Sequence, residues 1–172
     1  YNRSLNDLEI TALASGHTSS GIVVEELADG SFVARPEGRG PFPAVLYNHG
    51  GLDTSVGGDL KGTCIALAEA GYLARAELRP ESISPDGQLE DVLYGLDQLL
   101  NHPDADTSKV AIMGFSRGGL LALQAAIERP GDIDAVVLMA PAPGKGTMEE
   151  ILTDVSSLTA PVHIYVAEND NQ

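Results

Sequence analysis

Short apolar runs alternate along the chain with amphipathic segments of helical periodicity, and this alternation is the feature that most restricts the fold. The runs that we expect to form strands are Ala44–Asn48, Leu73–Leu78, Val110–Gly114, Ala135–Ala140 and Val162–Ala167. The segments that we expect to form helices are Asp59–Ala70, Gln88–Leu100, Arg117–Arg129 and Met148–Leu158. Strands that alternate with helices form βαβ units around a parallel sheet. The sequence therefore predicts an α/β fold with a mostly parallel sheet and helices on both faces.

A β-hairpin is expected ahead of the first of these strands. Ile22–Glu26 and Ser31–Arg35 are β-prone runs, and Ala28–Gly30 between them is typical of a tight turn. Residues 1–21 are expected to form a leading segment before the sheet. The 172 residues, with a mass of 18.0 kDa, suit one domain of ordinary size. We therefore expect a single domain over residues 1–172.

The charge balance excludes several classes of partner. The formal net charge is −15, from 25 acidic and 10 basic residues. Nucleic acids and anionic lipids are bound through Lys and Arg, so neither nucleic acid nor a membrane is an expected partner. Cys64 is the only cysteine, so no internal disulfide can form, and the sequence indicates no particular cellular compartment.

The segment Gly114–Gly119 carries the sharpest chemical signal. It has the form G-x-S-x-G, follows an apolar strand and opens a helix, which is the context of a nucleophile elbow. Such a turn needs glycines on either side because a Cβ there would clash, and it exposes the Oγ of its central residue. The pattern predicts Ser116 as a nucleophile. The alternative is that Ser116 is an ordinary helix N-cap.

A second glycine-rich turn, Asn48–Gly51, follows the first parallel strand. A backbone N–H from this turn and the N–H of Arg117 would together make a two-donor oxyanion hole. We expect Gly51 to supply the first of these donors, with Leu52 as the alternative. We expect His49 to order the turn by hydrogen bonding rather than to act as a base.

A carboxylate beyond the last strand completes the candidate site. The order nucleophile, acid, histidine along the chain places a triad acid at this point. We favour Asp170, with Glu168 or a plain solvated carboxylate as alternatives. The Arg117 side chain is expected to pack or pair on the surface, with contact to a substrate carboxylate as the alternative. The segment Glu77–Arg79 is expected either to line the pocket or to form a surface ion pair, which would contribute less than about 1 kcal/mol.

These residues together resemble the α/β-hydrolase fold and, within it, the dienelactone-hydrolase-like branch. Lys109–Gly119 resembles the nucleophile region of that branch, Asn48–Gly51 its oxyanion loop, and Ala167–Asp170 its acid-bearing turn. Leu78–Asp97 also resembles the related peptidase domains of the prolyl-oligopeptidase type. Dienelactone hydrolases proper use cysteine as the nucleophile, whereas this chain has Ser116. The resemblance implies hydrolysis of carboxylic esters or, less often, of peptides.

The resemblance also implies a triad histidine after one more helix and a last strand, and the chain ends at Gln172 before either. We do not expect His17, His102 or His163 to replace it. The expected fold is therefore an α/β-hydrolase domain lacking its last strand and helix, with an exposed sheet edge. The isolated chain is expected to be inactive. A second chain or self-association could complete the sheet edge and supply the histidine.

Three function hypotheses follow from these residues. The favoured one is a serine hydrolase that cleaves a small carboxylic ester through an acyl-enzyme intermediate. The alternatives are a peptidase of the prolyl-oligopeptidase type and a non-catalytic binding module derived from a hydrolase. No cofactor or metal is expected, because the sequence has no cluster with metal-ligand spacing and Gly114–Gly119 lacks the Lys-Ser/Thr ending of a phosphate loop.

Overall fold

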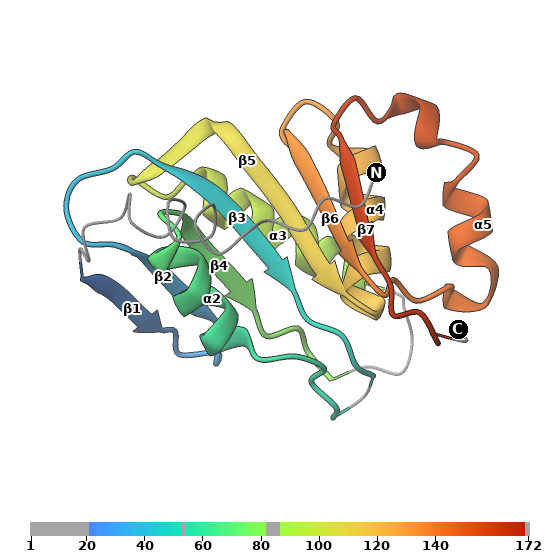
Figure 1. The fold of residues 1–172 in the computed structure, drawn as a ribbon, viewed down its shortest axis with the longest axis horizontal. Coiled ribbons are helices and arrows are strands. Elements are labelled where there is room, and N and C mark those ends of the chain that lie inside the picture. The colour runs from blue at the N-terminus through green and yellow to red at the C-terminus, as the bar shows by residue number, and fades with distance from the viewer. Residues whose placement is uncertain (1–20, 53, 82–86, 171–172) are drawn as a thin grey trace.

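The computed structural model describes residues 21–52, 54–81 and 87–170. The strands in these ranges form one twisted sheet with the order β1-β2-β4-β3-β5-β6-β7 (Figure 1). The strands are β1 (Ile22–Glu26), β2 (Phe32–Pro36), β3 (Phe42–Asn48), β4 (Leu73–Glu77), β5 (Ala105–Phe115), β6 (Ala135–Met139) and β7 (Val162–Tyr165). Strands β4, β3, β5, β6 and β7 are parallel to one another. Strand β2 runs antiparallel to β4, and β1 runs antiparallel to β2. The predicted mostly parallel sheet is confirmed.

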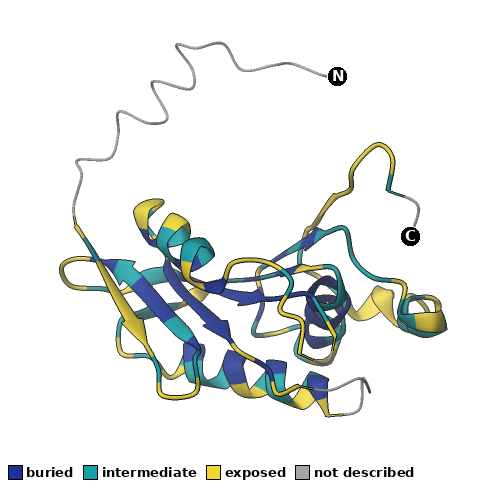
Figure 2. Cartoon of the chain, turned by 90° about the horizontal axis from the view of Figure 1, so that it is seen from below, coloured by how far each residue is buried: buried dark blue, intermediate teal, exposed yellow. Residues whose placement is uncertain are grey.

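Helices cover both faces of this sheet, as the sequence predicts. They are α2 (Leu60–Glu69), α3 (Gln88–Leu100), α4 (Arg117–Glu128) and the short α5 (Thr147–Ile151), with 3-10 turns at Gly144–Gly146 and Val155–Ser157. Helix α2 lies on one face against β1, β2 and β4, and α3 and α4 lie on the other (Figure 1). The buried residues form two clusters accordingly, one under α2 and a larger one under α3 and α4 (Figure 2).

The sequence specifies the ends of α2 closely. The Asp59 carboxylate accepts a hydrogen bond of 2.9 Å from the N–H of Gly62, which caps the first turn. At the other end Gly71 has φ of 98°. The N–H groups of Gly71 and Tyr72 bond back to the carbonyls of Ala68 and Leu67, a Schellman motif. Helix α2 therefore ends just before Gly71, the glycine that follows the predicted helical segment Asp59–Ala70.

Two expected elements differ from the structure. Strand β5 begins at Ala105 rather than at Val110, because Ala105 pairs with Phe42 ahead of a register shift. The helix expected over Met148–Leu158 is wrong, because α5 ends at Ile151 and a separate 3-10 turn follows. Leu152 is 49 % exposed, so little apolar packing stabilises a longer helix there.

Strand β7 forms the last edge of the sheet in the described part of the chain. All of its residues are exposed, and Ile164 and Tyr165 are 60 % and 62 % exposed. Within the described ranges β7 pairs with β6 alone. This arrangement agrees with the expected exposed, apolar sheet edge.

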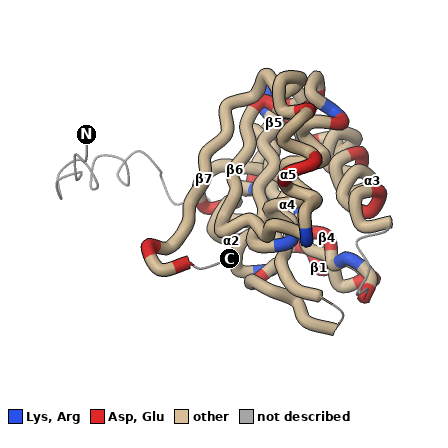
Figure 3. Tube along the Cα trace, turned by 90° about the vertical axis from the view of Figure 1, so that its right-hand side faces the viewer, with Lys and Arg blue, Asp and Glu red and all other residues tan. Residues whose placement is uncertain are grey.

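The surface carries the acidity that the composition indicates. Figure 3 shows Asp and Glu on α3, on α5 and in the segment after β7, with Lys and Arg interspersed sparsely. Among the helices in the described ranges, none is long and apolar enough to cross a membrane.

Candidate active site

Ser116 lies at the sharp junction between β5 and α4. Its φ and ψ are 51° and −117°, a backbone conformation that residues other than glycine rarely adopt. Two hydrogen bonds of 2.9 Å hold this conformation, one from the Ser116 N–H to the Met139 carbonyl and one from the Ala142 N–H to the Ser116 carbonyl. The side chain makes no capping hydrogen bond to α4, so the structure gives no support to a simple helix-cap role.

The glycines of the turn are required by close backbone contacts. A Cβ at Gly114 would lie 2.1 Å from the Gly118 carbonyl oxygen. A Cβ at Gly118 would lie 2.0 Å from the Asn48 carbonyl oxygen and 2.4 Å from that of His49. The first turn of α4 therefore lies directly against the end of β3. This contact brings the expected nucleophile and the expected oxyanion loop together.

Gly118→Ala is expected to destabilise the fold by about 1–3 kcal/mol or more, because the added methyl meets backbone carbonyls that cannot rotate away. Gly131→Ala is the matched control, since a Cβ there meets nothing within 4 Å. It is expected to change stability by less than about 0.5 kcal/mol. Urea unfolding followed by circular dichroism measures both. Equal midpoints for the two variants would contradict the close contact at Gly118.

The turn after β3 is rigidly built and faces the elbow. Gly50 exchanges two hydrogen bonds with Gly57, of 2.7 and 2.9 Å. Gly51 has φ of 96°, and a Cβ there would lie 1.8 Å from the Ser55 carbonyl oxygen. The N–H groups of Gly51, Leu52 and Arg117 donate no hydrogen bond to any described residue. All three are therefore available as donors at the carboxyl edge of the sheet.

His49 orders this turn, as the sequence analysis expects. Its Nδ1 lies 2.6 Å from the Gly50 carbonyl oxygen, and its Nε2 accepts a hydrogen bond of 3.2 Å from the Arg79 N–H. Burial, with a smaller contribution from the positive charge of Arg79, lowers the pKa of His49 from 6.5 to about 4. Both ring nitrogens are engaged, so His49 is not placed to act as a base.

The predicted surface ion pair within Glu77–Arg79 does not form, so this alternative is wrong. Both side chains are buried, and the Glu77 carboxylate pairs with Arg75 and accepts a hydrogen bond of 2.9 Å from the Ser31 hydroxyl. Arg79 turns instead toward the turn after β3, where its Nη2 donates to the His49 carbonyl oxygen. Arg75 and Arg79 each lie two residues from Glu77, so the sequence alone does not show which of them pairs with it. Strand β4 ends at Glu77, so Arg79 lies beyond the strand, whereas Arg75 lies within it.

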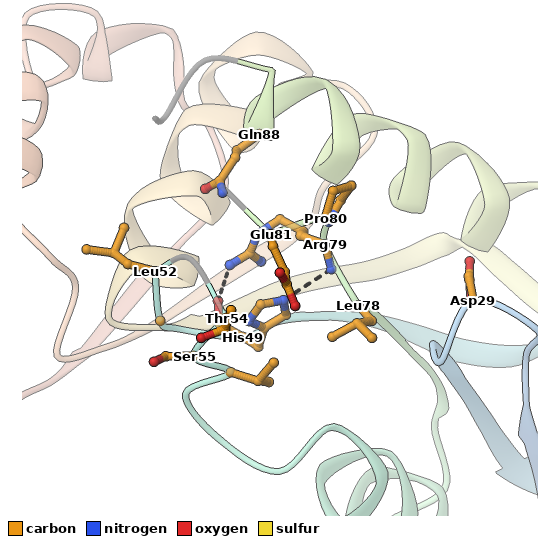
Figure 4. Close-up of a pocket in the computed structure, with 12 residues that line it drawn as sticks. Asp29, His49, Leu52, Thr54, Ser55, Leu78, Arg79, Pro80, Glu81 and Gln88 are labelled. Carbon is orange, nitrogen blue, oxygen red and sulfur yellow. Dashed lines mark hydrogen bonds between the residues drawn. The ribbon is translucent and has the colours of Figure 1, made fainter. Parts of the chain in front are cut away.

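A cavity of about 340 Å³ opens beside the turn after β3 (Figure 4). Its lining residues are Asp29, His49, Gly51, Leu52, Thr54, Ser55, Val56, Leu78, Arg79, Pro80, Glu81 and Gln88. They come from the turn between β1 and β2, the turn after β3, the segment after β4 and the start of α3. The alternative expectation for Glu77–Arg79, that this segment lines the pocket, is thus met by Leu78 and Arg79. The Arg117 side chain is half-buried, and burial lowers its pKa.

The two candidate acids lie in the turn after β7. In the register of the sheet, Phe115 pairs with Met139 and Met139 pairs with Tyr165. The turns after β5 and β7 therefore emerge at the same edge, about 10 Å apart across β6. Asp170 is half-buried, its N–H bonds to the Ala167 carbonyl, and Glu168 is exposed. This placement makes Asp170 the better positioned of the two.

The remaining histidines lie away from the elbow or outside the residues that the structure describes. His102 follows α3 at the opposite end of β5, where its Nδ1 accepts a hydrogen bond from the Asp104 N–H. His163 lies on the exposed strand β7, and His17 lies outside the described residues. In the described ranges no group of three or more His, Cys, Asp or Glu side chains could hold a metal ion.

The strand order, the elbow and the adjoining glycine-rich turn define the class of protein, which is an α/β-hydrolase. A model of the dienelactone hydrolase family matches residues 81–172, just over half of the chain. The chain belongs to this family, as the resemblance in the sequence indicates.

Two curated relatives match by sequence. "Uncharacterized peptidase YtmA" of Bacillus subtilis (strain 168) is 29% identical over 128 residues, which cover 70% of this chain and 48% of that protein. "Putative esterase NocK" of Nocardia uniformis subsp. tsuyamanensis is 32% identical over 111 residues, which cover 56% of this chain and 31% of that protein. The matched parts of the chain thus span about half and about a third of the length of these relatives.

Solved structures with the same fold include an esterase and a prolyl endopeptidase. Esterase Est22 superimposes with a TM-score of 0.64 and 22% identity, covering 92% of this chain and 71% of its own. A structure from a study of two prolyl endopeptidases gives a TM-score of 0.51 and 23% identity, covering 70% of this chain and 21% of its own. At these identities the likeness establishes the α/β-hydrolase fold.

Proposed function

We propose that the natural protein containing this chain is a serine hydrolase that cleaves carboxylic esters through an acyl-enzyme intermediate, with Ser116 as the nucleophile. The observation that carries the proposal is the backbone of Ser116, held at a positive φ between β5 and α4 with no capping bond. Strain of this kind persists where surrounding structure enforces it, and it concentrates at active sites. Ser116 follows β5 at the carboxyl edge of the sheet and lies beside the turn after β3, part of which lines the cavity; this position supports the proposal.

In the proposed reaction the Ser116 oxygen attacks the ester carbonyl carbon and its proton passes to a histidine. The N–H groups of Gly51 and Arg117 donate to the oxygen of the tetrahedral intermediate, and the N-terminus of α4 adds a partial positive charge. The intermediate expels the alcohol, which takes the proton, and water then hydrolyses the acyl-enzyme. Asp170 orients the histidine.

The proposal takes the histidine from outside this chain. The described histidines are engaged, as His49 is, or lie away from Ser116, as His102 and His163 do. Without a positioned base a serine hydroxyl is a poor nucleophile. The 172 residues alone are therefore proposed to be inactive on esters, and activity is proposed for a protein in which a histidine is positioned beside Ser116.

A peptidase is the second candidate, because the relative YtmA carries that name and a prolyl endopeptidase shares the fold. Esters and amides pass through the same tetrahedral intermediate, so the elbow and oxyanion loop fit both. The name of the relative NocK, and of Est22 among the structures, supports the esterase. A p-nitrophenyl acetate assay beside a prolyl p-nitroanilide assay separates the two candidates.

The test of the proposal is covalent labelling of the natural protein with a fluorophosphonate, which reacts with activated serines. Intact-mass analysis is expected to show one adduct, and peptide mapping is expected to place it on Ser116. Ser116→Ala is expected to abolish the adduct. Ser157→Ala, which changes an exposed hydroxyl bonded only to the Asp154 carbonyl, is expected to leave it unchanged. Absence of labelling in the unaltered natural protein would favour a non-catalytic module.

A further inference from the structure

Arg79 is a buried cation that forms no close ion pair with any described residue. The residue is 5% exposed, and no described carboxylate lies within ion-pairing distance of its guanidinium. Its Nε and Nη1 are buried and make no hydrogen bond. A buried charge without a counter-ion is destabilising unless other contacts compensate. Arg79 also lines the cavity, and the negative charge of Asp91 partly offsets the cost of its burial.

The two hydrogen bonds that Arg79 donates to described residues both reach His49, in the turn after β3 (Figure 4). Its Nη2 donates to the His49 carbonyl oxygen at 2.5 Å, and its backbone N–H donates to His49 Nε2 at 3.2 Å. A backbone N–H can only donate, so Nε2 carries no proton in this arrangement. The proton of the neutral ring is therefore on Nδ1, which donates to the Gly50 carbonyl oxygen at 2.6 Å.

These bonds fix two successive peptide planes. The plane between His49 and Gly50 is held at its oxygen by Arg79 and at its N–H by the Gly57 carbonyl. The plane between Gly50 and Gly51 is held at its oxygen by His49 Nδ1 and by the Gly57 N–H. In a trans peptide the N–H points opposite to the carbonyl. Fixing the Gly50 oxygen therefore fixes the direction of the Gly51 N–H.

The same planes lie against the elbow. The carbonyl oxygens of Asn48 and His49 would be within 2.4 Å of a Cβ on Gly118, and a Cβ on Gly50 would lie 3.1 Å from that of Ser116. A shift of the His49 carbonyl would therefore move the loop relative to the nucleophile. Arg79 is the described side chain that holds that carbonyl.

We propose that Arg79 is a positioning residue of the oxyanion hole, which acts through His49 to aim the Gly51 N–H at the oxygen developed on the substrate. The inference rests on the proposed function and extends it to a side chain that does not touch the substrate. The charged and titratable groups that act on Arg79 are Arg117, Asp91 and Tyr47, and the charge that acts on His49 is that of Arg79.

The test compares Arg79→Met with Arg79→Lys in the natural protein. Arg79→Met is expected to lower kcat for p-nitrophenyl acetate by about 10–100-fold with KM changed less than about threefold, because a misaimed oxyanion donor weakens transition-state binding. Arg79→Lys is expected to recover part of kcat, since its ammonium can donate to the His49 oxygen. Arg35→Met is the control, because Arg35 also donates to backbone carbonyls but lies on β2 away from the elbow. It is expected to leave kcat within about twofold.

A second readout does not depend on activity. In ¹⁵N-resolved NMR spectra of the histidine rings, His49 is expected to be neutral with its proton on Nδ1 at pH 7. Loss of the Arg79 charge favours the protonated ring, so the pKa of His49 is expected to rise from about 4 in Arg79→Met, staying below 6.5 because the ring remains buried. Arg35→Met is expected to leave that pKa unchanged.

The outcomes separate the inference from the proposed function. Normal kcat in folded Arg79→Met, or the same loss of kcat in Arg35→Met, would overturn the positioning role. A natural protein without any esterase activity would overturn the proposed function instead. If the natural protein has no esterase activity, the NMR measurements still test the coupling between Arg79 and His49. A proton on Nε2 of His49, or a pKa of His49 that is unchanged in Arg79→Met, would overturn that coupling. Persistence of the Nδ1 proton and of the pKa rise would support it.

Discussion

Ser116→Ala is expected to lower kcat of the natural protein on a carboxylic ester by about 10⁶-fold, the loss found when a serine hydrolase is deprived of its nucleophile. The structure gives the change a clean interpretation. The Ser116 side chain makes no capping bond, so its hydroxyl contributes little to α4. The backbone at φ of 51° is held by bonds to Met139 and Ala142 that an alanine can also make.

The measurement is steady-state hydrolysis of p-nitrophenyl acetate together with thermal unfolding of the same samples. The melting temperature of Ser116→Ala is expected to stay near that of the natural protein. The residual rate is expected to be roughly 10³–10⁴ over water, since the oxyanion hole and binding remain. Ser157→Ala is expected to match the natural protein in both measurements. A variant lacking the Ser116 hydroxyl that retained most of its turnover would remove Ser116 from the mechanism.

The sequence predicts the elbow well because its requirements are local. A strand, a turn and a helix lie within Val110–Arg129, and the glycines mark the positions where backbones touch. The structure shows the contact of Gly118 with the end of β3 that those glycines imply. The paired glycines of the oxyanion turn and the terminal glycine of α2 are likewise explained by backbone geometry next to them in the chain.

The role of Arg79 could not be predicted in the same way. Glu77 has an arginine two residues away on each side, and sequence spacing alone does not choose between them. The choice depends on Ser31, which reaches the Glu77 carboxylate from the hairpin, and on the end of β4. The expected helix Met148–Leu158 fails for a related reason. Its apolar residues have the spacing of a helix, but Leu152 and Val155 are 49 % and 39 % exposed, while Met148, Ile151 and Leu158 are partly buried against the core.

Asp170→Asn is expected to lower kcat by about 10⁴-fold with KM nearly unchanged. In the proposed triad the carboxylate holds the histidine in the tautomer whose free nitrogen accepts the serine proton, and an amide favours the other tautomer. The turn after β7 emerges at the same sheet edge as Ser116, two strands away, which is the span a bridging histidine has to cross. The substitution keeps the size of the side chain, so the turn should keep its shape.

Glu168→Gln is the matched comparison, because it lies in the same turn but its side chain is exposed. It is expected to change kcat by less than about threefold. Parallel assays of both variants with p-nitrophenyl acetate assign the acid directly. A large loss in Glu168→Gln with normal turnover in Asp170→Asn would transfer the role to Glu168. Normal turnover in both variants would mean that neither carboxylate orients the base.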